Sequence, residues 1–138
     1  MPVLVDMAAD SFADLTKEAI LNTFAAGEEV FAEGDNVQAL YLILAGRAEA
    51  YVRDSSGKQQ QAYSMSRGDF FGEISLFSGK PSAVTIRASE DLEVMLIVSD
   101  IAQALVERKP SLARELGVTI EKRTRLIETT RQTATTPS

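Results

Sequence analysis

Hydrophobic and polar residues alternate with a period of two along most of the middle of the chain. The alternation is clearest in residues 40–44 and 47–53, and it returns at 84–86 and 92–98. A period of two is typical of β-strands that turn one face toward the core. Residues 54–57, Asp-Ser-Ser-Gly, predict the tight turn of a hairpin between two of these strands.

The predicted strands are short and closely spaced, with glycines between them. Glycine is expected at such corners because the chain often adopts a positive φ there. We therefore expect a mainly β fold with flanking helices, a β-roll or jelly roll of about eight strands. The glycines between the predicted strands are Gly27, Gly34, Gly46, Gly57, Gly68 and Gly79.

A short N-terminal helix is predicted over residues 11–22, ahead of the strands. Ser11 and Asp14 resemble a capping box, and Phe12 and Leu15 fall on one helical face. The pattern ends before Gly27, where the period changes to two.

Two further helices are predicted after the strands. The first follows residue 100 and would be capped by Ser99 or Asp100. Pro110 ends it and can occupy the first turn of the second helix. The second helix carries an apolar stripe that could pack on the roll or pair with the same helix of a second copy in a homodimer. The stripe consists of Leu112, Leu116, Ile120 and Ile127.

At 138 residues, the chain is long enough for one domain with its own core. We expect this domain over residues 11–128, between an N-terminal segment (1–10) and a flexible Thr-rich tail (129–138). No apolar run approaches the ~20 residues that cross a bilayer, and no signal-peptide pattern is visible. We therefore expect a cytoplasmic chain without a membrane segment.

The composition argues against several kinds of site. The chain has no cysteine and no histidine, which excludes disulfides, thiolate metal sites and the usual general base. Its net charge of −6 argues against binding to nucleic acid. We expect a protein that is not an enzyme and holds no metal or cofactor. The charge is uneven: residues 1–35 are acidic and residues 108–131 are basic. The surfaces formed by these two segments could attract each other, or the basic helix could contact another partner.

Residues 71–88 carry the most specific chemistry in the chain. A Gly-Glu pair precedes a short helical turn, and a Gly/Pro loop leads from this turn into a strand. A helix N-terminus presents unpaired N–H groups and a partial positive charge. Residues 72–76 are therefore predicted to hold an anion such as a phosphate.

This order of elements, with the anion-binding stretch late in the roll, resembles the cyclic nucleotide-binding domain family. The family includes protein kinase A regulatory subunits, the catabolite activator protein and cyclic-nucleotide-gated channels. The likeness covers about residues 12–128 and looks closest to bacterial channel-type versions. It is carried by GEEVFAEGD at 27–35, LYLILAGRAEAYVRD at 40–54, GDFFGEISL at 68–76 and PSAVTIRA at 81–88.

The resemblance implies a ligand, cyclic AMP or another cyclic nucleotide, and a role for each residue of the helical turn. Gly72 would let the backbone come close to the ligand. Glu73 would accept a hydrogen bond from the ribose 2′-hydroxyl, although it could instead cap its own helix. The backbone N–H groups of Ile74 and Ser75 would hold the cyclic phosphate.

The resemblance also implies a pocket wall and a lid. Phe71 and Val84 would line the base and sugar pocket, although alternating apolar residues of a roll are usually core residues. Arg123 or Leu126, on the last helix, would contact the base as part of the lid.

Ser82 stands where the family places its phosphate-binding arginine. A serine hydroxyl offers one neutral donor in place of a forked, charged set. A hydrogen bond to a charged group is worth about 1.5–3 kcal/mol, so its loss weakens binding roughly 10- to 100-fold. Lys80 is the better candidate for a replacement cation, because Arg87 matches an ordinary surface position of the family, although a loop lysine such as Lys80 is more often simply solvated. Ala83, directly after Ser82, gives no preference for cyclic GMP.

Two functions follow from these observations. The first is a regulatory domain that binds a cyclic nucleotide, cyclic AMP in preference, and couples binding to movement of the C-terminal helix. The second is a degenerate member of the fold that binds no nucleotide and serves as a protein-interaction or dimerisation module. No nucleophile–base pair or metal-ligand cluster in the sequence indicates an enzyme.

Overall fold

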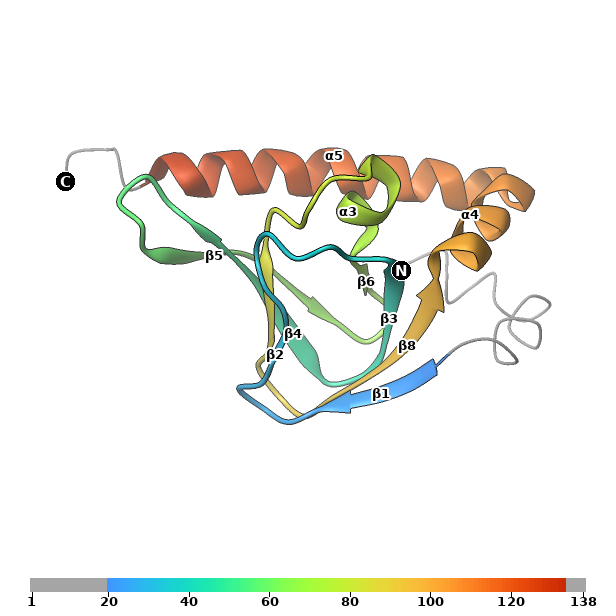
Figure 1. Cartoon of the computed structure of the whole chain (residues 1–138), viewed down its shortest axis with the longest axis horizontal. Coiled ribbons are helices and arrows are strands. Elements are labelled where there is room, and N and C mark those ends of the chain that lie inside the picture. The colour runs from blue at the N-terminus through green and yellow to red at the C-terminus, as the bar shows by residue number, and fades with distance from the viewer. Residues whose placement is uncertain (1–19, 134–138) are drawn as a thin grey trace.

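The computed structural model describes residues 20–133 as two antiparallel four-stranded sheets with helices along one side (Figure 1). The strand orders are β1-β8-β3-β6 and β2-β7-β4-β5, which confirms the predicted roll of eight strands. The strands are β1 (Ile20–Phe24), β2 (Glu29–Phe31), β3 (Ala39–Ala45), β4 (Arg47–Arg53), β5 (Gln59–Ser66), β6 (Phe70–Phe71), β7 (Thr85–Ala88) and β8 (Leu92–Val98). The helices are α3 (Glu73–Ser78), α4 (Ser99–Arg108) and α5 (Pro110–Thr133).

Strand β4 has the alternation that its sequence predicts. Ala48, Ala50 and Val52 are fully buried, and the residues between them are more exposed. The predicted turn closes the hairpin from β4 to β5. The Asp54 carboxylate stabilises this turn because it accepts the Ser56 N–H at 2.9 Å.

Strands β3 and β8 depart from the expected pattern because both of their faces are covered. Ile43 of β3 points into the core between the sheets, whereas Leu42 packs in a second cluster beneath α4 and α5. In β8, Met95 joins this second cluster, and Val98 is 39% exposed although the alternation places it in the core. The helices cover the outer face of this sheet, so its central strands have two buried sides.

Helix α5 runs along the whole length of the roll and packs on it (Figure 1). Leu112 and Leu116 are buried in the second cluster, Ile127 is buried in the core between the sheets, and Ile120 is half-buried. Three of the four stripe residues are therefore buried within their own chain. Within residues 20–133, no helix combines the length and the apolar composition that a membrane span requires.

The predicted first helix is wrong at its C-terminal end. Residues 20–22 belong to β1, where Ile20 lies opposite Leu96 and Asn22 opposite Val94 of β8. Pairing along the edge of the sheet satisfies the backbone N–H and C=O groups that a helix would otherwise have used. Residues 1–19, which hold the rest of this prediction, lie outside the described part of the chain.

The other two helices are confirmed, with different ends. Helix α4 follows Val98 without a side-chain cap, so neither predicted capping residue caps it. Helix α5 begins at Pro110 as predicted but continues to Thr133, into the segment predicted as a tail. Its last turns contact the roll, because the Ser55 N–H donates to the Arg131 carbonyl at 3.2 Å.

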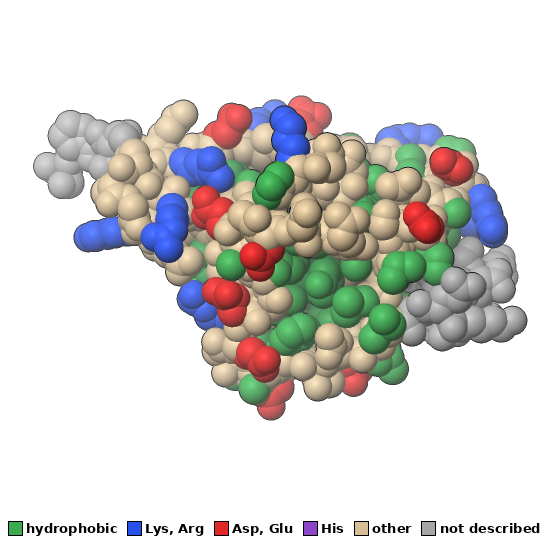
Figure 2. Space-filling view, viewed as in Figure 1, with side chains coloured by type: hydrophobic (Ala, Val, Ile, Leu, Met, Phe, Trp, Pro, Cys, Tyr) green, Lys and Arg blue, Asp and Glu red, His purple; other side chains and the backbone are tan. Residues whose placement is uncertain are grey.

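Charged side chains of both signs lie among one another on the face that Figure 2 shows. Figure 2 shows Lys and Arg side chains gathered toward the two ends of α5, and hydrophobic side chains gathered between the two sheets. One ion pair joins the acidic and basic segments, since the Glu33 carboxylate lies 3.7 Å from the Arg131 guanidinium. The acidic and basic segments therefore meet at this ion pair.

Gly46 joins β3 to β4 where only a glycine fits. Its φ is +90°, and a Cβ there would lie 2.1 Å from the Asp91 carbonyl oxygen. We expect Gly46→Ala to lower the free energy of unfolding by more than ~3 kcal/mol, since it adds a clash with backbone to a left-handed conformation. Urea unfolding followed by circular dichroism measures this loss.

Gly57 offers a matched control in the next turn. Its φ is +88°, but a Cβ there would meet nothing within 4 Å. Gly57→Ala should therefore show only the conformational penalty, about 1–2 kcal/mol. Equal losses in the two variants would contradict the clash at Gly46.

Candidate functional site

Helix α3 begins at a glycine that the fold itself requires. Gly72 is the N-cap, with φ +87°, and a Cβ there would lie 2.8 Å from the Ala39 carbonyl oxygen. This close contact holds the start of α3 against β3. The N–H groups of Ile74 and Ser75 belong to the first turn and have no acceptor within the helix. They lie at a small cavity, which Gly72, Ile74 and Ser75 help to line.

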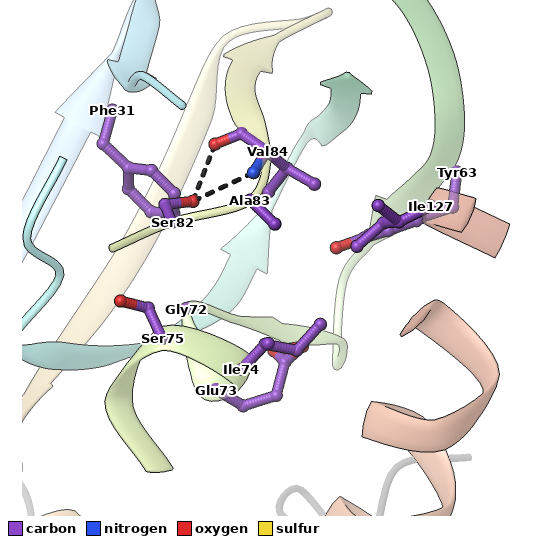
Figure 3. Close-up of a pocket in the computed structure, with 10 residues that line it drawn as sticks. All are labelled: Phe31, Tyr63, Gly72, Glu73, Ile74, Ser75, Ser82, Ala83, Val84 and Ile127. Carbon is purple, nitrogen blue, oxygen red and sulfur yellow. Dashed lines mark hydrogen bonds between the residues drawn. The ribbon is translucent and has the colours of Figure 1, made fainter. Parts of the chain in front are cut away.

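The loop before β7 forms the opposite wall of the cavity (Figure 3). Ser82, Ala83 and Val84 line this wall. The Ser82 hydroxyl donates to the Val84 carbonyl at 2.7 Å and accepts the Val84 N–H at 3.2 Å. The hydroxyl is thus engaged in a local turn of its own loop and is buried there.

Glu73 and Arg123 form a buried ion pair between α3 and α5. One guanidinium nitrogen lies 2.9 Å from each carboxylate oxygen of Glu73 and donates to the Phe70 carbonyl at 2.7 Å. The guanidinium also lies 4.9 Å from the centre of the Tyr63 ring. Glu73 is only 1% exposed, so little water reaches its charge. Arg123 is therefore the group that compensates this carboxylate.

Burial and charge shift two pKa values at this pair. Burial raises the pKa of the Glu73 carboxyl, and the Arg123 guanidinium opposes that rise. Burial, together with the negative charge of Glu73, raises the pKa of the Tyr63 phenol. The charged form of Glu73 is thus favoured by its cation and disfavoured by burial, which makes the pair sensitive to the loss of either partner.

The cavity between these groups is small because α5 closes it. Its volume is about 10 Å³, roughly the space for one water molecule. Pockets for small ligands usually occupy about 300–1,000 Å³, so the cavity in this conformation is too small for a ligand of nucleotide size. The lining residues are Phe31, Tyr63, Gly72, Glu73, Ile74, Ser75, Ser82, Ala83, Val84 and Ile127.

A larger hollow of about 470 Å³ lies at the opposite end of the roll, between the β1 turn and β8. Its charged lining residues are Asp91 and Glu93. Carboxylates repel a phosphate, so this hollow does not suit an anionic ligand. Among residues 20–133, no group of three Asp or Glu side chains gathers as metal ligands would.

Most of the predicted site residues meet at the small cavity, but three lie elsewhere. Phe71 is in the hydrophobic core, stacked on Tyr41 with ring centres 4.7 Å apart, so its ring packs the roll instead of lining the cavity. Leu126 is half-buried and does not line the cavity either. Arg123 reaches Glu73 instead of an open base position.

Three lining residues were not predicted as part of the site. Ile127 was visible only as a member of the apolar stripe, and Phe31 only as part of a family-like stretch. Tyr63 gave no local signal. Their common feature is that distant elements bring them to the cavity: β2, β5 and α5.

The two basic residues near the loop do not face the cavity. Lys80 is exposed, and no ion pair joins it to another residue of the described range. Arg87 lies over the Tyr51 ring at 4.7 Å and donates to Gln59 at 3.2 Å, on the outer face of its sheet. Arg87 thus has the surface position predicted for it.

Comparison with known proteins identifies the fold. The family model described as "Cyclic nucleotide-binding domain" matches residues 21–109. The chain belongs to the cyclic nucleotide-binding domain family. The matched region holds both walls of the cavity, and α5, which covers it, follows directly.

Known relatives of this cyclic nucleotide-binding domain include regulators of two kinds. It is 39% identical over 77 residues to the cAMP-dependent protein kinase regulatory subunit of Emericella nidulans, a match that covers 56% of this chain and 18% of that protein. It is 28% identical over 102 residues to the cyclic AMP receptor protein of Thermus thermophilus, covering 74% and 47%. The chain thus spans less than half the length of these two relatives.

A solved structure supports the same assignment. The catabolite activator protein of Thermus thermophilus superposes with a TM-score of 0.77 at 25% identity, over 91% of this chain and 59% of that one. The superposition extends beyond the region of the family model, so the fold is shared over most of the chain.

We expect Arg123→Met to lower the free energy of unfolding by about 3–5 kcal/mol at pH 7.5, because it leaves a buried carboxylate without its cation. The loss should be smaller at pH 5.5. A carboxyl with a raised pKa in the folded state adds stability when it is protonated, below its unfolded pKa, and loses this contribution as the pH rises through its folded pKa. Removing the cation raises the pKa of Glu73 further, so the variant gains more than the wild type from acid. Urea unfolding at the two pH values tests this.

Arg125 provides the matched control for this substitution. It lies on the same helix, but its side chain is 70% exposed and pairs with Glu121 at 3.6 Å. Arg125→Met should change the unfolding free energy by less than about 0.5 kcal/mol. The double variant Glu73→Gln/Arg123→Met should recover most of the stability that Arg123→Met loses, because it also removes the buried charge. A loss that is equal at both pH values would show that the Glu73 charge is not its cause.

Proposed function

We propose that this chain is a regulatory domain that binds cyclic AMP weakly and transmits binding through α5. The observation that carries this proposal is the small cavity at which a buried carboxylate, Glu73, and the N-terminus of α3 meet beneath α5. The two relatives named for cyclic AMP support the choice of ligand.

The cavity wall offers a partner for each part of the ligand. Glu73 accepts a hydrogen bond from the ribose 2′-hydroxyl. The N–H groups of Ile74 and Ser75 hold the cyclic phosphate with the help of the α3 dipole. Val84 and Ile127 present apolar surface to the sugar and base. These contacts rest on the family likeness and on the arrangement of the side chains around the cavity.

Binding must rearrange α5, because the ligand and Arg123 compete for the same carboxylate. The ribose hydroxyl reaches Glu73 only after the guanidinium has moved. The first half of α5 stays anchored by Leu112 and Leu116 in the second cluster. The second half therefore moves to admit the ligand, and a ligand that favours a pose of this half over the pocket shifts the population of the two poses.

A second function is favoured by the closure of the cavity. The site is nearly filled, Glu73 has a partner, and the Ser82 hydroxyl is engaged in its own loop. These features also suit a member of the fold that binds no nucleotide and serves as an interaction module. Affinity for cyclic AMP decides between the two functions.

We expect calorimetric titration to show weak binding of cyclic AMP to the wild-type chain, and Ser82→Arg to raise the affinity at least tenfold. The variant places a forked cation at the loop that lines the cavity, and a charged hydrogen bond is worth roughly 10- to 100-fold in affinity. Ser78→Arg adds the same charge at an exposed position outside the cavity and should leave affinity nearly unchanged.

The opposite outcome is equally clear. If millimolar cyclic AMP gives no heat and no shift in melting temperature with either the wild type or Ser82→Arg, the sensor function is excluded. The interaction module is then the better description of this chain.

Coupling to α5 can be measured separately, because the chain has no native cysteine. Spin labels at Glu128→Cys on α5 and Glu93→Cys on β8 lie at exposed positions. We expect cyclic AMP to change the distribution of distances between the labels in the Ser82→Arg background. Unchanged distances at saturating ligand would show that binding does not move α5.

A further inference from the structure

The loop at residues 82–84 lacks a cation of its own but touches one from α5. A guanidinium nitrogen of Arg131 donates to the Ala83 carbonyl at 3.2 Å. Ala83 follows Ser82, and both residues line the cavity. The positive charge thus lies beside the residue that replaces the family's arginine, although it comes from a helix about 50 residues further along the chain.

Two contacts hold the end of α5 in this position. The Ser55 N–H, in the β4–β5 hairpin, donates to the Arg131 carbonyl at 3.2 Å. The Glu33 carboxylate lies 3.7 Å from the Arg131 guanidinium. Arg131 also shares one helical face with Arg123 and Ile127, since the three are spaced four residues apart. This face is the one that covers the cavity.

The other two arginines near the site are committed elsewhere, and Lys80 does not line the cavity. Arg123 is buried against Glu73, and Arg87 lies on the outer face of its sheet. Lys80 is exposed. The Arg131 side chain, in contrast, is 44% exposed and contacts the loop through one nitrogen. A guanidinium has five N–H donors, so most of its capacity is available to a ligand.

We propose that Arg131 supplies the cation for the phosphate that the loop lacks at position 82. This inference rests on the proposed function. When the ligand binds, the guanidinium exchanges the Ala83 carbonyl for phosphate oxygens. The ion pair between Arg131 and Glu33 is exposed to water, so it contributes little free energy and opposes this exchange only weakly.

A cation on α5 makes phosphate binding depend on the position of the helix, whereas an arginine on the loop does not. A cation on the loop binds phosphate wherever α5 lies. A cation on α5 binds phosphate only when the end of the helix is near the loop. Binding of the phosphate is therefore coupled directly to the position of α5. Even a weakly bound ligand would then favour the pose in which the end of the helix lies near the loop.

A double-mutant cycle between positions 82 and 131 tests the proposal. Cyclic AMP affinity is measured by calorimetry for the wild type, Arg131→Gln, Ser82→Arg and the double variant. We expect Arg131→Gln to weaken binding about tenfold in the wild-type background and less than about twofold in the Ser82→Arg background, where the loop has its own cation. Arg131→Lys keeps the charge and should retain part of the affinity.

Arg125→Gln is the matched control, because it removes an exposed arginine from the same helix without touching the loop. It should leave affinity unchanged in both backgrounds. Melting temperatures without ligand establish that each variant is folded.

The results separate this inference from the function on which it rests. If Arg131→Gln weakens binding equally in both backgrounds, Arg131 only ties the helix to the loop and the inference is overturned. Binding that is insensitive to Arg131→Gln overturns it as well, while the proposed function stands. Absence of binding in the wild type and in Ser82→Arg overturns the proposed function and the inference together.

Discussion

The buried pair of Glu73 and Arg123 determines how the rest of the structure is arranged. A carboxylate that is 1% exposed needs a compensating charge, and the guanidinium needs acceptors, which it finds in Glu73 and the Phe70 carbonyl. These contacts bring α3, β6 and α5 together at one point, with Tyr63 of β5 stacked beside them. They place the guanidinium against the carboxylate beside the cavity.

Helix α5 is held by two different kinds of contact along its length. Its first half buries Leu112 and Leu116 in an apolar cluster, a type of contact that is lost only at a large cost in free energy. Its second half is held by Ile127 and by polar contacts of Arg123 and Arg131. Polar contacts can be exchanged for those of an anionic, hydroxyl-rich ligand. One continuous helix is thus attached by apolar packing at its start and by a mixture of apolar and polar contacts toward its end.

Local patterns predicted much of the fold, and non-local pairing accounts for the errors. The alternation in β4, the hairpin turn and the start of α5 at Pro110 depend on neighbouring residues, and all three are confirmed. Residues 20–22 were placed in a helix because their pairing with β8, more than 70 residues away, leaves no local trace. The second cluster was missed for the same reason, since a period of two does not show that helices cover the outer face of a sheet.

The sequence by itself determined the chemistry of the cavity wall. Glycine at 72 and the helical turn after it predicted an anion site from residue type and short spacing, and the family resemblance implied the roles of Glu73 and Ser82. Only the tertiary structure decided which residues of α5 meet that wall. It selected Ile127 instead of Leu126, gave Glu73 to Arg123, and set Arg131 beside Ala83. The rotation and path of a helix over a roll depend on packing summed along its whole length, which a pattern of neighbouring residues does not contain.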